Sequence, residues 1–191
     1  MSNALARSLP RFAIAAAVFC LSIATHRSSA DVVIPLSIEQ LTARADLVLH
    51  GSVLAMETRR DEAGRIFTRI EIAVEETWKG ELATNRFTVV QGGGVLGDKR
   101  TTVTGQAGYK VGERLILFLA LNSRGEGVTL GLAQGKFDIV QDAASTELFV
   151  RSPFHGGGAA GFQVGRASPS QSASSRLTLS ALKQRVKGGA R

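Results

Sequence analysis

Cysteine and histidine are scarce in this 191-residue chain, which has one Cys and three His. The single cysteine, Cys20, excludes an intrachain disulfide, so the hydrophobic core has to stabilise the fold. A zinc site needs three or four ligands, usually Cys or His at close spacing. His50 lies in a strand pattern and His155 precedes three glycines, so we interpret both as structural residues. The sequence predicts no metal and no other cofactor.

Long apolar runs are missing after residue 30. A membrane-spanning helix needs about 20 apolar residues, whereas the stretch Phe12 to Ala24 has 13. Arg7 and Arg11 precede this stretch, and Ser28-Ser29-Ala30 follows it. A basic start, a short apolar core and a small-residue cleavage site are typical of a secretory signal peptide. We predict a signal peptide over residues 1–30, export to the periplasm or the extracellular space, and no transmembrane segment in the mature chain.

A strong excess of one charge is also lacking. The net charge is +7, but three of the 23 Lys and Arg residues and none of the 16 acidic residues precede position 31, which leaves +4. This mild excess favours solubility, and an exported protein rarely meets nucleic acid, so we expect no nucleic-acid partner. The remaining 161 residues are enough for one domain that buries most of its apolar surface, and too few for two.

Local patterns predict one helix followed by strands. Ser37 and Gln40 are spaced as a capping box, which predicts a short helix over residues 38–45. From residue 46 to 54 apolar residues alternate with others, and the same period of two recurs from 66 to 75. The turn residues 61–64 separate these two runs, so we expect them to form a long antiparallel hairpin.

Further short strands complete a barrel in this interpretation. A third strand is expected over 87–91, a central strand over 115–119, and shorter ones over 128–132, 136–140 and 148–151. Residues 92–112 read as a long loop, which is either functional or mobile. The predicted fold is mostly β: an OB-like closed or partly open antiparallel barrel of about five to seven strands, occupying residues 31–151.

The composition changes after this region. Residues 152–175 are rich in Gly and Ser, which predicts a flexible linker. Leu179, Leu182 and Val186 then recur at helical spacing, with basic residues toward the end. Residues 176–191 are therefore expected to form a basic amphipathic helical tail that docks back on the domain.

No catalytic motif stands out. Residues 92–99 are rich in glycine but place Asp98 where a phosphate-binding loop has lysine, and no Gly-x-Ser-x-Gly elbow is present. Glu75 and Glu76 are adjacent on a strand, so their side chains should point to opposite faces. Glu71 and Glu75 should share a face, which we interpret as solvated. The sequence therefore predicts a protein that is not an enzyme.

Candidate interaction residues come from the aromatic and glycine content. Phe67, Trp78 and Tyr109 are the aromatic residues that we considered for a binding face, with Arg69, Lys79 and Lys110 beside them. Trp78 also reads as a plug at one end of the barrel. With the start of the glycine-bearing loop, the candidate interaction set is Trp78, Lys79, Gly92, Gly93, Gly94, Tyr109 and Lys110.

Five segments, taken in order, carry a resemblance: residues 45–51, 74–80, 91–97, 112–119 and 131–137. In that order they resemble an uncharacterised family of exported bacterial OB-like β-barrel proteins, some of which occur beside matrixin-like metalloproteases. The layout is also similar, more weakly, to the OB barrels of netrin and TIMP-type inhibitors. Those inhibitors bind the protease zinc through an N-terminal cysteine, which a chain starting at Asp31 lacks, so that mechanism does not carry over.

These observations predict an exported, non-enzymatic interaction module of the cell envelope or the extracellular space, whose partner is another exported protein. Two alternatives stay open. The first is an inhibitor or accessory protein of a co-secreted metalloprotease, as the resemblance implies. The second is a carboxylate-based glycan hydrolase or oligosaccharide binder, which would need two acidic side chains converging in a cleft.

Overall fold

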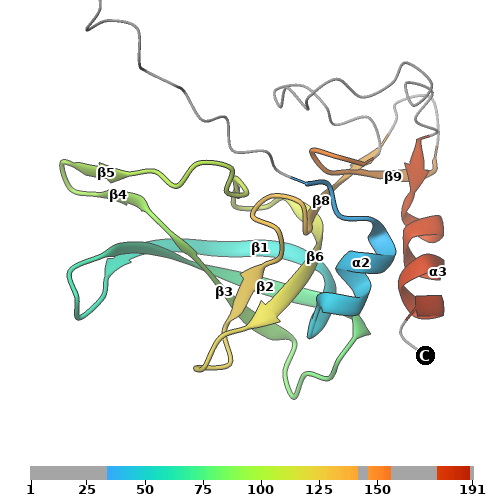
Figure 1. Ribbon diagram of the computed structural model, residues 1–191, viewed down its shortest axis with the longest axis horizontal. Coiled ribbons are helices and arrows are strands. Elements are labelled where there is room, and N and C mark those ends of the chain that lie inside the picture. The colour runs from blue at the N-terminus through green and yellow to red at the C-terminus, as the bar shows by residue number, and fades with distance from the viewer. Residues whose placement is uncertain (1–33, 142–145, 156–175, 190–191) are drawn as a thin grey trace, which may run out of the picture. The chain divides into compact units, whose positions relative to one another are not determined.

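The computed structural model of the chain describes residues 34–141, 146–155 and 176–189. The predicted signal peptide and nearly all of the predicted linker, residues 156–175, lie outside these ranges. Figure 1 shows the elements, which in chain order are α2 (Ile38–Arg44), β1 (Leu47–Arg60), β2 (Ile66–Lys79), β3 (Arg86–Gly92), β4 (Gly94–Leu96), β5 (Lys99–Thr101), β6 (Arg114–Leu121), β7 (Gly127–Thr129), β8 (Lys136–Gln141), β9 (Leu148–Arg151), β10 (Leu177–Thr178) and α3 (Leu179–Gly189).

The first helix starts where the sequence predicts it. Ser37 is the N-cap of α2, with its side chain accepting from the Gln40 backbone while the Gln40 side chain accepts from the Ser37 backbone. At the other end, Lys79 of β2 donates from Nζ to Thr42 O at 2.8 Å and to Ala45 O at 2.7 Å. A lysine from the sheet therefore satisfies carbonyls that the helix terminus leaves open.

The barrel is closed by pairing of its first strand with two partners. β1 pairs with β2 along its length and also with β6, from Leu47↔Leu119 to Ser52↔Arg114. The ring of strands runs β1-β2-β3-β7-β6 and back to β1, and β8, β9 and β10 continue the sheet from β6. This arrangement confirms the predicted mostly-β, OB-like barrel. The β3–β7 pairing at Val89↔Gly127 is parallel, so the barrel is mixed rather than purely antiparallel.

Gly51 allows β1, which pairs with two strands, to lie close to β2. A Cβ at Gly51 would lie 2.2 Å from Ala73 O of β2, a distance that no side chain can tolerate. Gly51 also pairs with Leu115 of β6. The absence of a side chain at this point is therefore a condition for β1 to lie between β2 and β6.

The segment predicted as a loop over residues 92–112 contains a second, two-stranded sheet. β4 and β5 form a hairpin, with Val95 opposite Arg100, and Figure 1 shows it at the side of the barrel away from α2 and α3. The remainder of the segment returns to the barrel, where Ala107 and Tyr109 are buried. The expectation of an irregular loop is therefore wrong in part: the segment has its own strands and contributes to the core.

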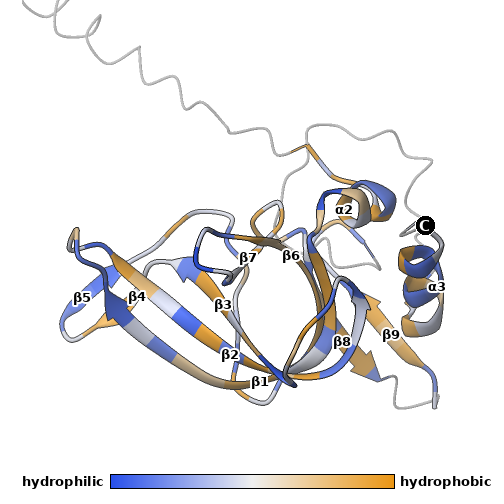
Figure 2. Ribbon diagram, turned by 90° about the horizontal axis from the view of Figure 1, so that it is seen from below, coloured by the Kyte–Doolittle hydropathy of each residue, from blue (hydrophilic) through white to orange (hydrophobic). Residues whose placement is uncertain are grey.

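Two apolar clusters lie on the two sides of the β1-β6-β8 sheet. The barrel interior holds Leu47, Leu49, Ile70, Ile72, Val89, Leu115, Leu117 and Leu119. The other side is covered by the helices, and this helix-side core includes Ile38, Leu41, Val48, Trp78, Ile116, Phe118, Phe137, Val150, Leu182 and Val186. Figure 2 shows α2 and α3 beyond β6, β8 and β9, with mixed apolar and polar positions along the strands. The continuously apolar β6 is thus covered on both faces, as its sequence indicates.

The C-terminal helix belongs to this helix-side core. Leu182 and Val186 of α3 are fully buried in it. Arg185 donates to Glu39 of α2 at 2.6 Å, and Lys183 lies 2.8 Å from Glu76 of β2. The predicted amphipathic helix therefore docks with its apolar face on the sheet and its basic residues on carboxylates of two other elements.

The chain is also fastened where it enters α2. Gln134, which is 4% exposed, accepts from Leu36 N at 2.7 Å and donates to Ile34 O at 3.2 Å. The ring of His155 stacks on Phe137 with centroids 5.6 Å apart, and its Nε2 lies 2.9 Å from Leu36 O.

Across residues 34–141, 146–155 and 176–189, no helix has the length and apolar character needed to cross a bilayer.

Candidate functional site

A polar hollow lies on the outer face of the barrel, across strands β1, β2 and β3. Cross-strand neighbours form two rows, Ala55↔Glu71↔Thr88 and Glu57↔Arg69↔Val90. Ile70 on β2 and Val89 on β3, which alternate with members of these rows, are buried in the barrel interior, so the rows face outward. The hollow has a volume of about 360 Å³ and is lined by Ala55, Glu57, Arg59, Arg69, Glu71 and Thr88. We call it the β1–β3 groove.

The groove exists because small side chains flank a long one. In its first row Ala55 and Thr88 stand on either side of Glu71. The next row places Arg69 between Glu57 and Val90. Space left by the alanine and the threonine is therefore bordered by charged groups from both rows.

The carboxylates in and beside the groove are held by arginines. Glu57 Oε2 lies 2.7 Å from Arg59, and the hydrogen bond from this guanidinium lowers the pKa of Glu57. Glu71 Oε1 accepts from Arg86 at 2.6 Å. Glu126, on the turn before β7, accepts from Asn122 at 3.1 Å and from Arg124 at 3.0 Å, and these bonds lower its pKa. Glu57 and Glu126 are therefore ionised at neutral pH, and each of the three carboxylates has a close partner.

Arg69 is different from these arginines. Its closest polar contacts among the described residues are Thr88 Oγ1 at 3.5 Å and Glu126 Oε1 at 3.9 Å. Both distances are long for a guanidinium, whose hydrogen bonds to carboxylates are normally 2.7–2.9 Å. The Arg69 side chain is 39% exposed. It therefore presents donors to the groove that no close acceptor uses.

The groove occupies the place where barrels of this topology bind ligands. In OB folds the outer face of strands 2 and 3, flanked by the loops between strands 1 and 2 and between strands 4 and 5, is the usual binding face. Here β6 and β7 are the fourth and fifth strands of the barrel. Glu126 on the β6–β7 turn reaches Arg69 on β2, so that turn borders the groove.

Two of the predicted interaction residues, Trp78 and Lys79, lie at the helix-side core. Trp78 is 5% exposed and donates from Nε1 to Glu76 at 3.0 Å. The ring belongs to the helix-side core and not to the cluster in the barrel interior, so its interpretation as a plug at the barrel end stays a prediction. Lys79 is occupied by the carbonyls at the end of α2. Both residues therefore have structural partners in the fold.

The three glycines predicted for the interaction set carry the chain from β3 into β4. Gly93 has φ +82° and Gly94 has φ +138°, both in the region that favours glycine. A Cβ on Gly94 would lie 2.5 Å from Thr68 Oγ1 and 2.7 Å from Thr58 Oγ1. Gly92, Gly93 and Gly94 thus let β4 cross tightly over the end of the first hairpin.

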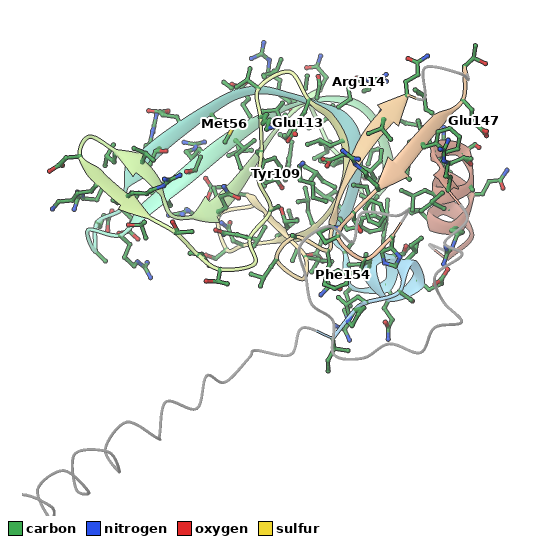
Figure 3. All side chains as sticks on the ribbon, turned by 90° about the horizontal axis from the view of Figure 1, so that it is seen from above. Met56, Tyr109, Glu113, Arg114, Glu147 and Phe154 are labelled. Carbon is green, nitrogen blue, oxygen red and sulfur yellow. The ribbon has the colours of Figure 1, made fainter. Side chains whose placement is uncertain are left out.

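Tyr109 and Lys110 are neighbours with opposite surroundings. Tyr109 is 8% exposed and belongs to the cluster of the barrel interior, and its hydroxyl lies 2.5 Å from Thr129 Oγ1. Figure 3 labels Tyr109 among the strands of the barrel. Burial raises the pKa of this hydroxyl. Lys110 is exposed. The structure therefore does not bring the seven predicted residues together on one face, and as an interaction surface that set stays a prediction.

The sequence pattern did not single out Glu57, Arg59, Glu71 or Thr88 as members of a binding site. Arg69 was noted only beside aromatic residues, and two of the aromatic residues considered, Trp78 and Tyr109, are buried. Alternation along a strand predicts that Glu57 and Arg59 share one face of β1, and that Arg69 and Glu71 share one face of β2. It does not predict which residues stand opposite each other, because register depends on bulges and turn geometry.

A bulge in β2 overturns one expectation about neighbouring carboxylates. His50 pairs with Glu76 and Gly51 with Val74, so Glu75 is an extra residue in β2. Glu75 Oε2 lies 3.4 Å from His50 Nε2, and the charge of Glu76 also acts on this ring. The prediction that Glu75 and Glu76 point to opposite faces is wrong here, because a bulge interrupts the alternation. Burial lowers the pKa of His50, which favours the neutral ring.

Several residues of the five resemblance segments make contacts that connect one element of the fold to another. Asp46 accepts from Leu121 N at 2.8 Å, which ties β1 to the end of β6. Gly51, Lys79 and Gln134 fix the barrel closure, the end of α2 and the entry to α2, as described above. These segments therefore mark structural requirements of the barrel.

Within the described part of the chain, no group of three or more His, Cys, Asp or Glu side chains is placed to hold a metal ion. Comparison of the chain with protein-family models and with curated proteins gives no match. The candidate site therefore rests on the geometry of the β1–β3 groove and on the OB-like topology that places it.

Proposed function

We propose that the protein is an exported binding module that takes up an extended segment of a partner protein in the β1–β3 groove. The observation that carries this proposal is the groove itself: a hollow of about 360 Å³ on the outer face of an OB-like barrel, lined by charged side chains of both signs. An extended polypeptide segment that carries charged side chains of both signs at strand spacing would complement such a surface.

The side chains of the groove favour a polypeptide over a nucleic acid. Single-stranded nucleic acid is usually bound by basic grooves with stacking aromatic rings. In this groove Glu57 and Glu71 alternate with the arginines, and they would repel a polyanion. The rings of Trp78 and Tyr109 are buried, so neither offers a stacking platform to a base. Phe67, opposite Arg59 on the face of the groove, is half-buried.

The pairing of the groove carboxylates with arginines favours binding over hydrolysis. A carboxylate-based glycosidase needs one carboxyl group with a raised pKa to act as general acid. Glu57 has a lowered pKa, and Glu71 accepts a 2.6 Å hydrogen bond from Arg86. Glu57 therefore favours the ionised form, and the Glu71 carboxylate is engaged by an arginine, which suits charge complementarity with a ligand.

Partner capture from the source cell's envelope and culture medium tests the proposal. The full chain is used as bait beside Ala55→Trp, which fills the groove from an exposed position without a change in charge. Ala83→Trp, on the exposed turn between β2 and β3, is the matched control. We expect a partner that is retained by the control and lost with Ala55→Trp. Equal capture by both variants would place binding elsewhere and overturn the proposal.

Export rests on the sequence pattern of residues 1–30, and it has its own test. We expect the protein recovered from the periplasm or the medium to begin at Asp31. N-terminal sequencing of the native protein measures this directly. An intact Met1 in a cytoplasmic fraction would remove the exported part of the proposal and leave the groove as a binding site.

A further inference from the structure

We infer that Arg69 anchors a carboxylate of the ligand and is the specificity-determining residue of the β1–β3 groove. The inference rests on the proposed function, because it names what the same groove recognises. The ligand class is a polypeptide segment that carries an isolated carboxylate, either an Asp or Glu side chain or a C-terminus.

The first argument is the difference in pairing among the arginines. Arg59, Arg86 and Arg124 lie 2.7 Å, 2.6 Å and 3.0 Å from their carboxylate partners. Arg69 reaches Thr88 Oγ1 at 3.5 Å and Glu126 Oε1 at 3.9 Å. A guanidinium has five N–H donors in a planar fork. The Arg69 fork is therefore the one in and beside the groove that the described residues leave without a close carboxylate.

The second argument is position. Arg69 lies in the middle strand of the three, with Glu57 opposite it on β1 and Val90 opposite it on β3. The space beside it is left by Ala55 and Thr88, which line the same hollow. A ligand carboxylate that entered this hollow could approach the fork directly. The guanidinium that pairs with this carboxylate would be positioned by a strand of the sheet rather than by a loop.

The third argument concerns the charge of the ligand. Glu57, Glu71 and Glu126 surround Arg69 at the groove. A polyanion would bring several negative groups against these carboxylates, whereas a single carboxylate meets the one arginine that can receive it. Like-charge contacts of this kind lower the affinity for wrong ligands. The arrangement therefore selects an isolated carboxylate.

Titration of the purified full chain with small probes, followed by NMR at the Arg69 Nε–Hε signal, tests this inference. The probes are N-acetylglutamate α-methylamide for a side-chain carboxylate, N-acetylglycine for a C-terminal one, N-acetylglutamine methylamide as the neutral control, and inorganic phosphate as a different anion. We expect one or both carboxylate probes to bind, with the stronger of the two identifying the source, and the neutral probe not to bind.

Three variants define the result. Arg69→Gln should weaken carboxylate binding by about 10- to 100-fold, the range for loss of a charge-assisted pair. Arg100→Gln removes the same charge from exposed β5 and should leave the affinity unchanged. Glu126→Gln should strengthen binding several-fold, because it removes the carboxylate that lies 3.9 Å from Arg69 and competes for it. A gain in affinity cannot result from misfolding.

Each other outcome counts against the inference. Unchanged affinity in Arg69→Gln, or phosphate bound more tightly than both carboxylates, would overturn it. Partner capture that is lost with Ala55→Trp but kept with Arg69→Gln would overturn it and leave the proposed function intact. Carboxylate binding at Arg69 in a protein that captures no partner would remove the proposed function while the anchor itself stands.

Discussion

The docking of α3 gives the sharpest test of how the domain is built. Leu182 is fully buried between α3 and the sheet, in the same cluster as Trp78 and Phe137. Replacing a buried leucine by alanine costs about 2–5 kcal/mol, from lost burial and the cavity that remains. We expect Leu182→Ala to lower the free energy of unfolding by about 3 kcal/mol and Tm by about 6–12 °C, at about 2–4 °C per kcal/mol for a domain of this size.

Urea unfolding of the full chain measures this effect with two probes. Trp78 is the only tryptophan and lies in the same cluster as Leu182, so its fluorescence reports on the helix-side core. Circular dichroism reports on the sheet. If α3 is part of one cooperative unit, both signals change together in the wild type and in the variant. Gln184→Ala, at an exposed position of the same helix, should change stability by less than about 0.5 kcal/mol.

The reasoning fails in a recognisable way. A loss below about 1 kcal/mol in Leu182→Ala, or a fluorescence transition well before the dichroism transition, would mean that α3 detaches before the barrel unfolds. The helix would then be a separable tail and not a member of the core.

Three further predictions concern single groups. Burial lowers the pKa of His50 and His155 in the folded protein, so as pH falls the unfolded chain binds protons at these rings before the folded chain does. The free energy of unfolding should therefore decrease as pH drops below about 6.5. Urea unfolding at pH 7.5 and 5.5 should show this decrease, and His50→Gln should make it smaller. Gly94→Ala should cost at least about 2 kcal/mol, whereas Gly97→Ala, with open space around its Cβ position, should cost less in the same assay. Glu76, whose pKa is lowered to about 2, chiefly by the hydrogen bond from Lys183, should contribute stability that is present above pH 4.5 and lost toward pH 2; Glu76→Gln should cost about 1 kcal/mol after screening of its partly exposed pairs, and acid titration should show a shallower loss than in the wild type.

Features that depend on neighbours in the sequence were predictable. The capping box at Ser37 and Gln40 requires only three-residue spacing, and it is present. The long first hairpin follows from alternation on either side of a turn, and β1 and β2 pair as expected. Leu182 and Val186 have helical spacing, and both are buried in the docked α3. In each case the local preference and the tertiary structure agree.

Features set by distant contacts were not predictable. The extra residue at Glu75 depends on how β2 lies against β1, and no local signal marks it. β4 and β5 have three residues each, which is too short for a period of two to stand out. Tyr109 is a candidate for a binding face in the sequence, but the chain returns it to the barrel interior.

The candidate site belongs to this second group. Glu57 and Arg69 face each other although 12 positions separate them, and Glu126 reaches the same groove from the β6–β7 turn. Only the register of three strands and the closure of the barrel bring these charges together. A sequence motif could not reveal them, because the spacing along the chain carries no information about the cross-strand neighbours.

The double pairing of β1 has a consequence for the order in which the chain can fold. Its partner β2 follows after a short turn, but its other partner β6 starts at Arg114. A nascent chain in which β6 has not yet been synthesised therefore has β1 with one unpaired edge, and such an edge can pair with another chain. Ring closure between Leu47 and Leu119 is a long-range contact, which makes it a slow step. Fragments that end before Arg114 should aggregate, and the complete chain is protected from aggregation at this edge only after β6 has paired with β1.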